Sequence, residues 1–424
     1  MVDMILEVLK ESGINQYEIT TTQYEDVQLY FIKSDLNMRR CGSMKEYKVT
    51  VYNEFEEKGQ KVIGSSCVNI SPEMEKTVIT KKLLDAYASA KYAPNQHFEL
   101  YAGEKSDRIL LEGREKEYTA QEIANLFAKA IYDANCNQNA FVNSAEVFVK
   151  KSVTAILNSN GVDVSYQSLD VDGEYIVQCK EPQDVELYYP FKYSRVCEEE
   201  LKKDIEQSLQ TVCDRANAKE PPKSGEYDVI LSDDDVRSLL SFYLYRSDAS
   251  AVYQKYSNYE VGMNVQGEEV SGDKLNIVLS SKNPYSKEGV LLKDIPLMEE
   301  GILKSLHGDV RYCKYLEMEP IGEHNKLLVK EGTKTIEELK EKPYLHVVSF
   351  SAFECDAFSG HFGGEIRLGY YFDGKEVKLV TGGSVSGNLI EAQKHLTFSK
   401  EMFENCRYVG PKMVRIEKVS VAGC

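Results

Sequence analysis

The sequence has no tryptophan, only six histidines and no run of 18 consecutive apolar residues. The lack of a long apolar run excludes a membrane-spanning helix. Apolar residues make up 42% of the 424 residues and charged residues 28%, as in an ordinary globular protein. We therefore expect two or three domains with hydrophobic cores.

Basic residues are also in short supply. The chain has 51 lysines and arginines against 68 aspartates and glutamates, which gives a net charge of −17. A negative field repels phosphate backbones, and no cluster of lysine and arginine offsets it. We expect no direct contact with nucleic acid.

C-x-x-C spacing is absent from the ten cysteines, which stand at positions 41, 67, 136, 179, 197, 213, 313, 355, 406 and 424. A chain of this size does not need disulfides, so we expect reduced thiols that serve mostly as small core residues. The N-terminus starts acidic and lacks the basic and apolar segments of a signal peptide. These features predict a cytoplasmic protein.

Catalytic motifs are missing as well. The sequence has neither G-x-x-x-x-G-K-[ST] nor a helix-opening G-x-G-x-x-G, and residues 383–387 do not complete G-x-S-x-G. No histidine lies in H-E-x-x-H or H-E-x-x-x-H. We therefore assign no catalytic residue, no metal ligand and no cofactor to this chain.

The first two segments show alternating helical and strand patterns. Residues 1–105 are expected to form a helix–strands–helix domain, with a first helix around residues 4–9 and a second from Ser71 to about Ala90. Residues 106–222 are expected to form a central α/β segment. Thr119 and Glu122 predict a capping box, three strands are expected at 145–151, 152–157 and 175–179, and a helix at 198–217.

A proline-containing stretch at residues 219–225 predicts the main boundary, before a larger β-rich domain at 223–424. A strand at 227–231 and a helix from Asp233 open it, and Asp373-Gly374 predicts a two-residue hairpin. The predicted class is α+β, with N-terminal α/β layers followed by this β-rich domain.

Three clusters have both a chemical and a structural interpretation. His346, Cys355, Asp356 and His361 lie near each other in the sequence and suggest a cation site, although structural roles are favoured for them. Residues 233–235, three aspartates, suggest a cation site or, preferably, helix capping. The tyrosines between 243 and 259 are expected to line a peptide cleft or to pack in the core.

The C-terminal half resembles the TldD/PmbA family, and its PmbA (TldE) branch more than its TldD branch. The order and spacing of several segments carry this resemblance. These segments are Ser224–Ser232, Ser238–Leu240, Asp248–Tyr253, Val261-Gly262, Glu288–Val290, Asp356–Phe362, Gly387–Leu389 and Val419–Gly423. The N-terminal pattern and the turn at residues 158–161 also suit the family, so the resemblance covers nearly the whole chain.

The resemblance implies a bacterial or archaeal protein tied to a metallopeptidase that trims or degrades peptides. In the TldD branch a helix carries H-E-x-x-x-H, which holds zinc and polarises water. The corresponding helix here, Val236–Ala251, has no histidine, so the resemblance implies zinc only in a TldD-like partner. An old name for the PmbA proteins is modulators of DNA gyrase. Because this chain is acidic, we expect any effect on gyrase to act through proteolysis or protein partners and not through contact with DNA.

The leading hypothesis is a metal-free subunit that pairs with a TldD-like peptidase, or with itself, and binds extended peptides. We expect its binding loop to contain Asp356, Ser359, Gly360, His361 and Phe362, although His361 replaces the acidic residue of the family's S-G-D-F pattern. One alternative is a stand-alone hydrolase that uses Cys355, Asp356, Ser359 and His361. Another is a homodimeric, non-catalytic peptide-binding protein.

Overall fold

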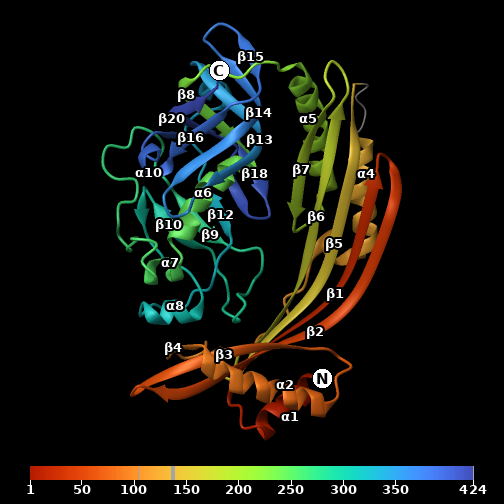
Figure 1. The fold of residues 1–424 in the computed structure, drawn as a ribbon, viewed down its shortest axis with the longest axis vertical. Coiled ribbons are helices and arrows are strands. Elements are labelled where there is room, and N and C mark those ends of the chain that lie inside the picture. The colour runs from red at the N-terminus through yellow and green to blue at the C-terminus, as the bar shows by residue number, and fades with distance from the viewer. Residues whose placement is uncertain (104, 135–138, 424) are drawn as a thin grey trace.

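The computed structural model describes residues 1–103, 105–134 and 139–423, and its architecture is α+β, as predicted (Figure 1). The N-terminal half contains one antiparallel sheet with the strand order β4-β3-β2-β1-β5-β6-β7. Its strands are β1 (Gln16–Ile32), β2 (Asp35–Glu57), β3 (Gln60–Ile70), β4 (Pro94–Gln96), β5 (Ala140–Asn158), β6 (Asp163–Cys179) and β7 (Val185–Tyr193). Residues on both sides of position 105 share this sheet, and the boundary expected there stays a prediction.

The three strands predicted between residues 145 and 179 were wrong in length. The segments 145–151 and 152–157 are parts of the single strand β5, and 175–179 is only the end of β6. The residues at 150–152, where the first two predicted strands meet, are polar. They stay in register because β5 is paired on both sides, to β1 and to β6, so the ladder of backbone hydrogen bonds continues through them.

Helices cover one face of the long strands. The helices α4 (Ala120–Asp133) and α5 (Glu198–Asn217) pack on β1, β5, β6 and β7 through one continuous apolar cluster. At the far end, α1 (Val2–Glu11) and α2 (Lys76–Ser89) pack together over β2 and β3 (Figure 1). The helix α2 begins five residues later than Ser71, because residues 71–74 form a turn in which the Met74 N–H donates to the Ser71 carbonyl. Two short helices complete this half of the chain: η1 (Ala90–Tyr92) and α3 (Gly113–Glu117).

The capping box of α4 is present as predicted. The Thr119 hydroxyl accepts the Glu122 N–H at 3.2 Å, and the Glu122 carboxylate accepts the Thr119 N–H at 2.8 Å. These bonds satisfy two backbone donors that an uncapped helix leaves unpaired.

Thr119→Ala is therefore expected to lower the free energy of unfolding by about 1 kcal/mol, because one capping acceptor is lost. Chemical denaturation followed by circular dichroism measures the change. Thr119→Ser keeps the acceptor and is the control. An equal loss in both variants would contradict the capping explanation.

The C-terminal half contains two sheets. One has the order β11-β10-β9-β12-β19-β18. In the other, the pairings β13–β8, β8–β20, β20–β16, β16–β14 and β14–β13 form a closed circuit, to which β15 and β17 are added. The strands are β8 (Gly225–Ser232), β9 (Ile277–Ser280), β10 (Ile295–Glu299), β11 (Ile302–Leu303), β12 (Lys326–Val329), β13 (Tyr344–Cys355), β14 (His361–Phe372), β15 (Val377–Val380), β16 (Ser384–Asn388), β17 (Leu396–Phe398), β18 (Met402–Asn405), β19 (Tyr408–Pro411) and β20 (Met413–Ala422).

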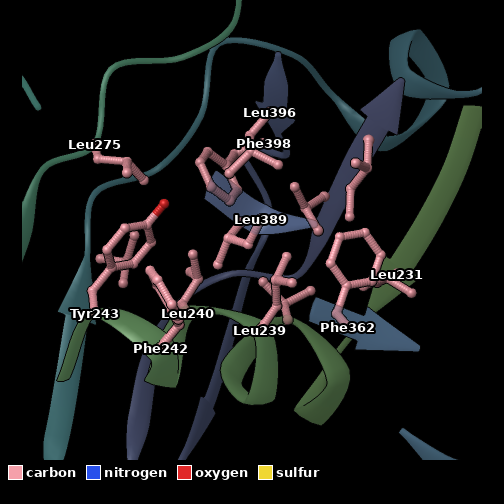
Figure 2. Packing of buried hydrophobic residues seen from close by; sticks show 14 of the residues in the cluster. Leu231, Leu239, Leu240, Phe242, Tyr243, Leu275, Phe362, Leu389, Leu396 and Phe398 are labelled. Atoms are coloured by element: carbon pink, nitrogen blue, oxygen red, sulfur yellow. The ribbon is translucent and has the colours of Figure 1, made fainter. Parts of the chain in front are cut away.

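The helix α6 (Asp234–Arg246) lies in the core between these sheets. Its apolar side chains share one buried cluster with residues of β8, β13, β14 and β17, and Figure 2 shows Leu231, Phe362 and Leu389 among them. The remaining helices are short, and they are α7 (Ala249–Tyr253), α8 (Val310–Tyr315), α9 (Ile336–Leu339) and α10 (Leu389–Ala392). The hairpin predicted at Asp373-Gly374 joins β14 to β15, but its connection spans residues 373–376, because the Asp373 carboxylate accepts the Lys375 and Glu376 N–H groups and closes a longer turn.

Seven described cysteines carry free thiols, at positions 41, 67, 179, 197, 313, 355 and 406. Cys41 and Cys67 are exposed, whereas the other five, like Cys213, are buried or half-buried. Cys136 and Cys424 lie outside the described residues. No helix in the described part of the chain is long and apolar enough to cross a bilayer.

Candidate functional site

The predicted binding loop connects β13 to β14 and forms a tight turn. The Asp356 carboxylate accepts the Ser359 N–H at 2.7 Å, the Ser359 hydroxyl at 2.6 Å and the Phe358 N–H at 3.2 Å. These hydrogen bonds from Ser359 and Phe358 lower the pKa of Asp356. Gly360 has a φ of 73°, which glycine adopts at little cost. Formation of this turn therefore explains the presence of Asp356, Ser359 and Gly360, three of the five residues predicted to bind a ligand.

The other two loop residues point to different environments. Phe362 is buried in the C-terminal core, with 3% of its surface exposed, so it serves packing. His361 is exposed, and its backbone pairs with Asn388 of β16. The five residues therefore do not converge on one cavity, and their binding role stays a prediction.

The geometry gives the hydrolase alternative little chemical support. Burial raises the pKa of the Cys355 thiol to about 12, so it is protonated at neutral pH and is a weak nucleophile. The Ser359 hydroxyl donates to Asp356 and not to a histidine. His346 and Cys355 stand near opposite ends of β13, roughly 30 Å apart along the strand, so the suggested cation cluster does not assemble.

Asp356→Ala is expected to open this turn, because three donors lose their acceptor. The amides of Phe358 and Ser359 should then exchange with deuterium faster, which hydrogen-exchange mass spectrometry detects. Asp356→Asn retains an acceptor oxygen and should keep most of the protection. Unchanged exchange in Asp356→Ala would contradict this account of the loop.

A cavity of about 770 Å³ lies elsewhere, between the two halves of the chain. The N-terminal half contributes α5 and β7, and the C-terminal half contributes the end of β8, the start of α6 and much of β13. Aromatic side chains line much of it, including Tyr188, Tyr189, Phe350, Phe353 and Phe403. None of the predicted loop residues 356–362 lines this cavity.

One wall of the cavity is an incompletely paired strand. β13 pairs with β14 from Tyr344 to Cys355, but with β8 only at Leu345 and His346. In the described part of the chain, the second edge of β13 beyond His346 has no strand partner. Val348, Ser349 and Phe350 of this stretch line the cavity, so an edge of β13 without a strand partner borders an aromatic space.

Aspartates at the start of α6 also line the cavity. Asp233 has φ 53° and ψ −120°, a strained conformation between β8 and α6, and its side chain makes no capping hydrogen bond. Of the predicted capping by residues 233–235, a side-chain hydrogen bond from Asp233 is therefore absent, whereas Asp234 and Asp235 lie in the first turn of α6, where their charges complement the helix dipole. Burial raises the pKa of Asp233 to about 6 and that of Asp235 to about 7. Asp234 instead pairs with Arg237, at 2.6 and 2.8 Å.

His346 lies in the wall of the same cavity with 5% of its surface exposed. Burial, followed by the charges of Lys340 and Lys412, lowers its pKa to about 3, so the ring is neutral. Its Nε2 lies 3.2 Å from the Ser232 hydroxyl. The sequence singled out His346 and residues 233–235, but it placed them in separate clusters.

The helix α6 does not offer the residues of a zinc site. Its inward-facing positions are Val236, Leu239, Leu240, Phe242 and Tyr243, all buried in the core (Figure 2). Within the described residues, no group of three or more histidine, cysteine, aspartate or glutamate side chains is arranged to hold a metal ion. The donor set therefore does not fit zinc.

The tyrosines between 243 and 259 divide between the two predicted roles. Tyr243 and Tyr259 are buried, and the Tyr243 hydroxyl donates to Gln393. Tyr245, Tyr253 and Tyr256 are exposed. None of the five lines the 770 Å³ cavity, whose aromatic residues come from β6, β7, β13 and other segments.

Comparison with known proteins identifies the C-terminal half. Residues 224–423 match the model of the PmbA/TldA metallopeptidase C-terminal domain. An uncharacterized protein of Methanocaldococcus jannaschii is 21% identical over 312 residues, which cover 66% of this chain and 70% of that protein.

Solved structures share the fold over the whole length. TldE from Thermococcus kodakarensis is 17% identical with a TM-score of 0.77, and it is covered in full, as is this chain. A proposed modulator of DNA gyrase from Thermotoga maritima is 17% identical with a TM-score of 0.78, over 99% of both chains. A similar protein from Bacteroides thetaiotaomicron is 16% identical with a TM-score of 0.79, over 100% of this chain and 99% of that one.

Proposed function

Because this chain belongs to the TldD/PmbA family, we propose that it is a PmbA/TldE-like subunit that binds extended peptides and presents them to a TldD-like zinc peptidase. In this proposal the chain contributes peptide binding in maturation or degradation, and the partner contributes the metal and the bond cleavage. The fold shared with TldE supports the pairing of two like-folded chains.

The observation that carries the proposal is the unpaired edge of β13 in the aromatic cavity. A peptide in extended conformation gains backbone hydrogen bonds when it adds to such an edge, and its alternate side chains enter pockets beside the strand. Phe350 and Phe353 of β13 and Tyr189 of β7 line these pockets. A folded domain offers few extended segments with free backbone groups, so the cavity favours unfolded or flexible substrates.

The composition of α6 supports the division of labour. Leu239, Leu240 and Tyr243 of α6 pack in the hydrophobic core. A zinc-binding histidine at one of these positions would be buried among apolar side chains. The proposal therefore assigns zinc to the partner and none to this chain.

The decisive experiment compares the chain alone with the chain mixed with a TldD-like subunit that carries H-E-x-x-x-H. Peptide cleavage is measured with and without a chelator, and bound zinc by elemental analysis. We expect chelator-sensitive cleavage only in the mixture, and faster cleavage than by the partner alone. Zinc and chelator-sensitive cleavage in the isolated chain would overturn the proposal.

A matched control uses a partner variant in which the motif glutamate is replaced. That mixture should bind peptide without cleaving it. If the isolated chain forms a homodimer that binds peptide, and the partner neither associates with it nor gains activity from it, the homodimeric alternative replaces the proposal.

A further inference from the structure

We propose that the cavity beside the start of α6 is a subsite for a positively charged group of an extended peptide, either its amino terminus or a lysine or arginine side chain. This inference rests on the proposed function, because it names the class of peptide that the cavity prefers.

The first argument is the group of carboxylates at this end of the cavity, of which Asp235 lacks a partner of opposite charge and Asp233 has only a distant one. The side chain of Asp235 forms neither a hydrogen bond nor an ion pair with any described residue, and Asp233 forms a long ion pair with Lys412, at 3.9 Å. Asp204 of α5 faces the same space and accepts a hydrogen bond from Tyr193. By contrast, Asp234 is held by Arg237. A bound cation would offset the cost of desolvating these groups.

The second argument is the aromatic lining. Cations are attracted to the faces of tyrosine and phenylalanine rings, most strongly where water is excluded. Tyr189 stacks on Tyr175 with 5.4 Å between ring centroids, and both line the cavity. The Tyr189 hydroxyl itself is buried beside Ser208 and Thr211, so it is the ring that Tyr189 offers to a ligand.

The third argument is the charge balance of the walls. Four aspartates line the cavity, at positions 204, 233, 234 and 235, against two lysines, Lys340 and Lys412. His346 adds no positive charge at neutral pH, because burial lowers its pKa to about 3. The chain as a whole carries −17, which steers cationic ligands toward it.

A pH dependence follows from this chemistry. Burial raises the pKa of Asp233 to about 6 and of Asp235 to about 7, so both carboxyl groups are partly protonated in the free cavity near neutral pH. A cation binds the ionised forms better and displaces their protons. Its affinity is therefore expected to rise between pH 5.5 and pH 8.

The test uses fluorescently labelled ten-residue peptides that share one flexible sequence. One has an acetylated amino terminus and a central lysine, a second replaces that lysine with glutamine, and a third has glutamine and a free amino terminus. Fluorescence anisotropy at 0.15 M salt gives each dissociation constant, for the wild type and for Asp233→Asn/Asp235→Asn. The control Asp107→Asn/Asp294→Asn removes two exposed charges outside the cavity.

At pH 7.5, where the peptide amine is still mostly charged, we expect the lysine peptide, the free-amine peptide or both to bind about tenfold more tightly than the acetylated glutamine peptide. The advantage should shrink at pH 5.5, disappear in Asp233→Asn/Asp235→Asn and persist in the control. The two cationic peptides distinguish a side-chain subsite from an amino-terminal one.

Equal binding of all three peptides would overturn the charge preference and leave the proposed function intact. If both double variants lose the preference for cationic peptides equally, net charge explains the preference and the subsite is overturned. The subsite is also overturned if Asp233→Asn/Asp235→Asn weakens the binding of all three peptides equally. Failure of every peptide to bind, with or without the partner, would overturn the proposed function as well.

Discussion

Arg415→Met is expected to lower the free energy of unfolding of the C-terminal half by about 3 kcal/mol. Arg415 of β20 has 8% of its surface exposed and pairs with Asp228 of β8 at 2.7 Å. It also donates to the carbonyls of Leu339, at 2.6 Å, and Pro343, at 2.8 Å. The substitution leaves the Asp228 carboxylate and the carbonyls of Leu339 and Pro343 without this donor. Urea denaturation followed by tyrosine fluorescence measures the loss, since the chain has no tryptophan.

A matched control replaces a more exposed pair. Arg237→Met breaks the ion pair with Asp234, whose side chain is 59% exposed, and should cost less than about 1 kcal/mol. If Arg415→Met costs no more than Arg237→Met, the buried network does not stabilise this half. The result bears on the site because Arg415 holds the segment that leads into β13, the strand whose free edge lines the cavity.

Local sequence patterns predicted local structure well. The helix at 198–217 and the capping box of α4 rest on residues within a few positions of one another, so their spacing contains the needed information. Strand lengths were harder, because β5 continues through polar residues only by pairing with β1 and β6, which are distant in sequence. The alternation of apolar residues does not record such partners.

The cavity could not be predicted from the sequence, because its walls come from segments that are distant along the chain. Tyr189, Asp235 and Phe350 line one space although more than 40 residues separate each from the next. The three aspartates were noticed, yet their position before a helix made capping the simpler interpretation. Only the structure brings them opposite α5 and β7, with His346 in the same wall. The loop at 356–362, by contrast, was chosen for its family resemblance, and its contacts are those of a turn.

The second large expected effect is the loss of folding stability at low pH that the buried His346 causes. In the unfolded chain this histidine is protonated near pH 6.5, whereas burial lowers its pKa in the folded protein to about 3. The unfolded state therefore binds the extra proton first, so the stability that the neutral ring contributes is complete above pH 6.5 and is lost as the pH falls toward 3. At pH 5 the loss amounts to about 2 kcal/mol.

His346→Gln removes this titration and retains a polar group beside Ser232. The difference in free energy of unfolding between wild type and His346→Gln should therefore shift by about 2 kcal/mol between pH 7.5 and pH 5, in favour of the variant. The comparison cancels the opposite effect of Asp233 and Asp235, because both proteins contain them. Ser232→Ala keeps His346 buried and should titrate like the wild type, since burial and not the hydroxyl is the main cause of the low pKa. A constant difference between wild type and His346→Gln would mean that the ring remains hydrated in the folded protein, and that the cavity wall opens to water at this point.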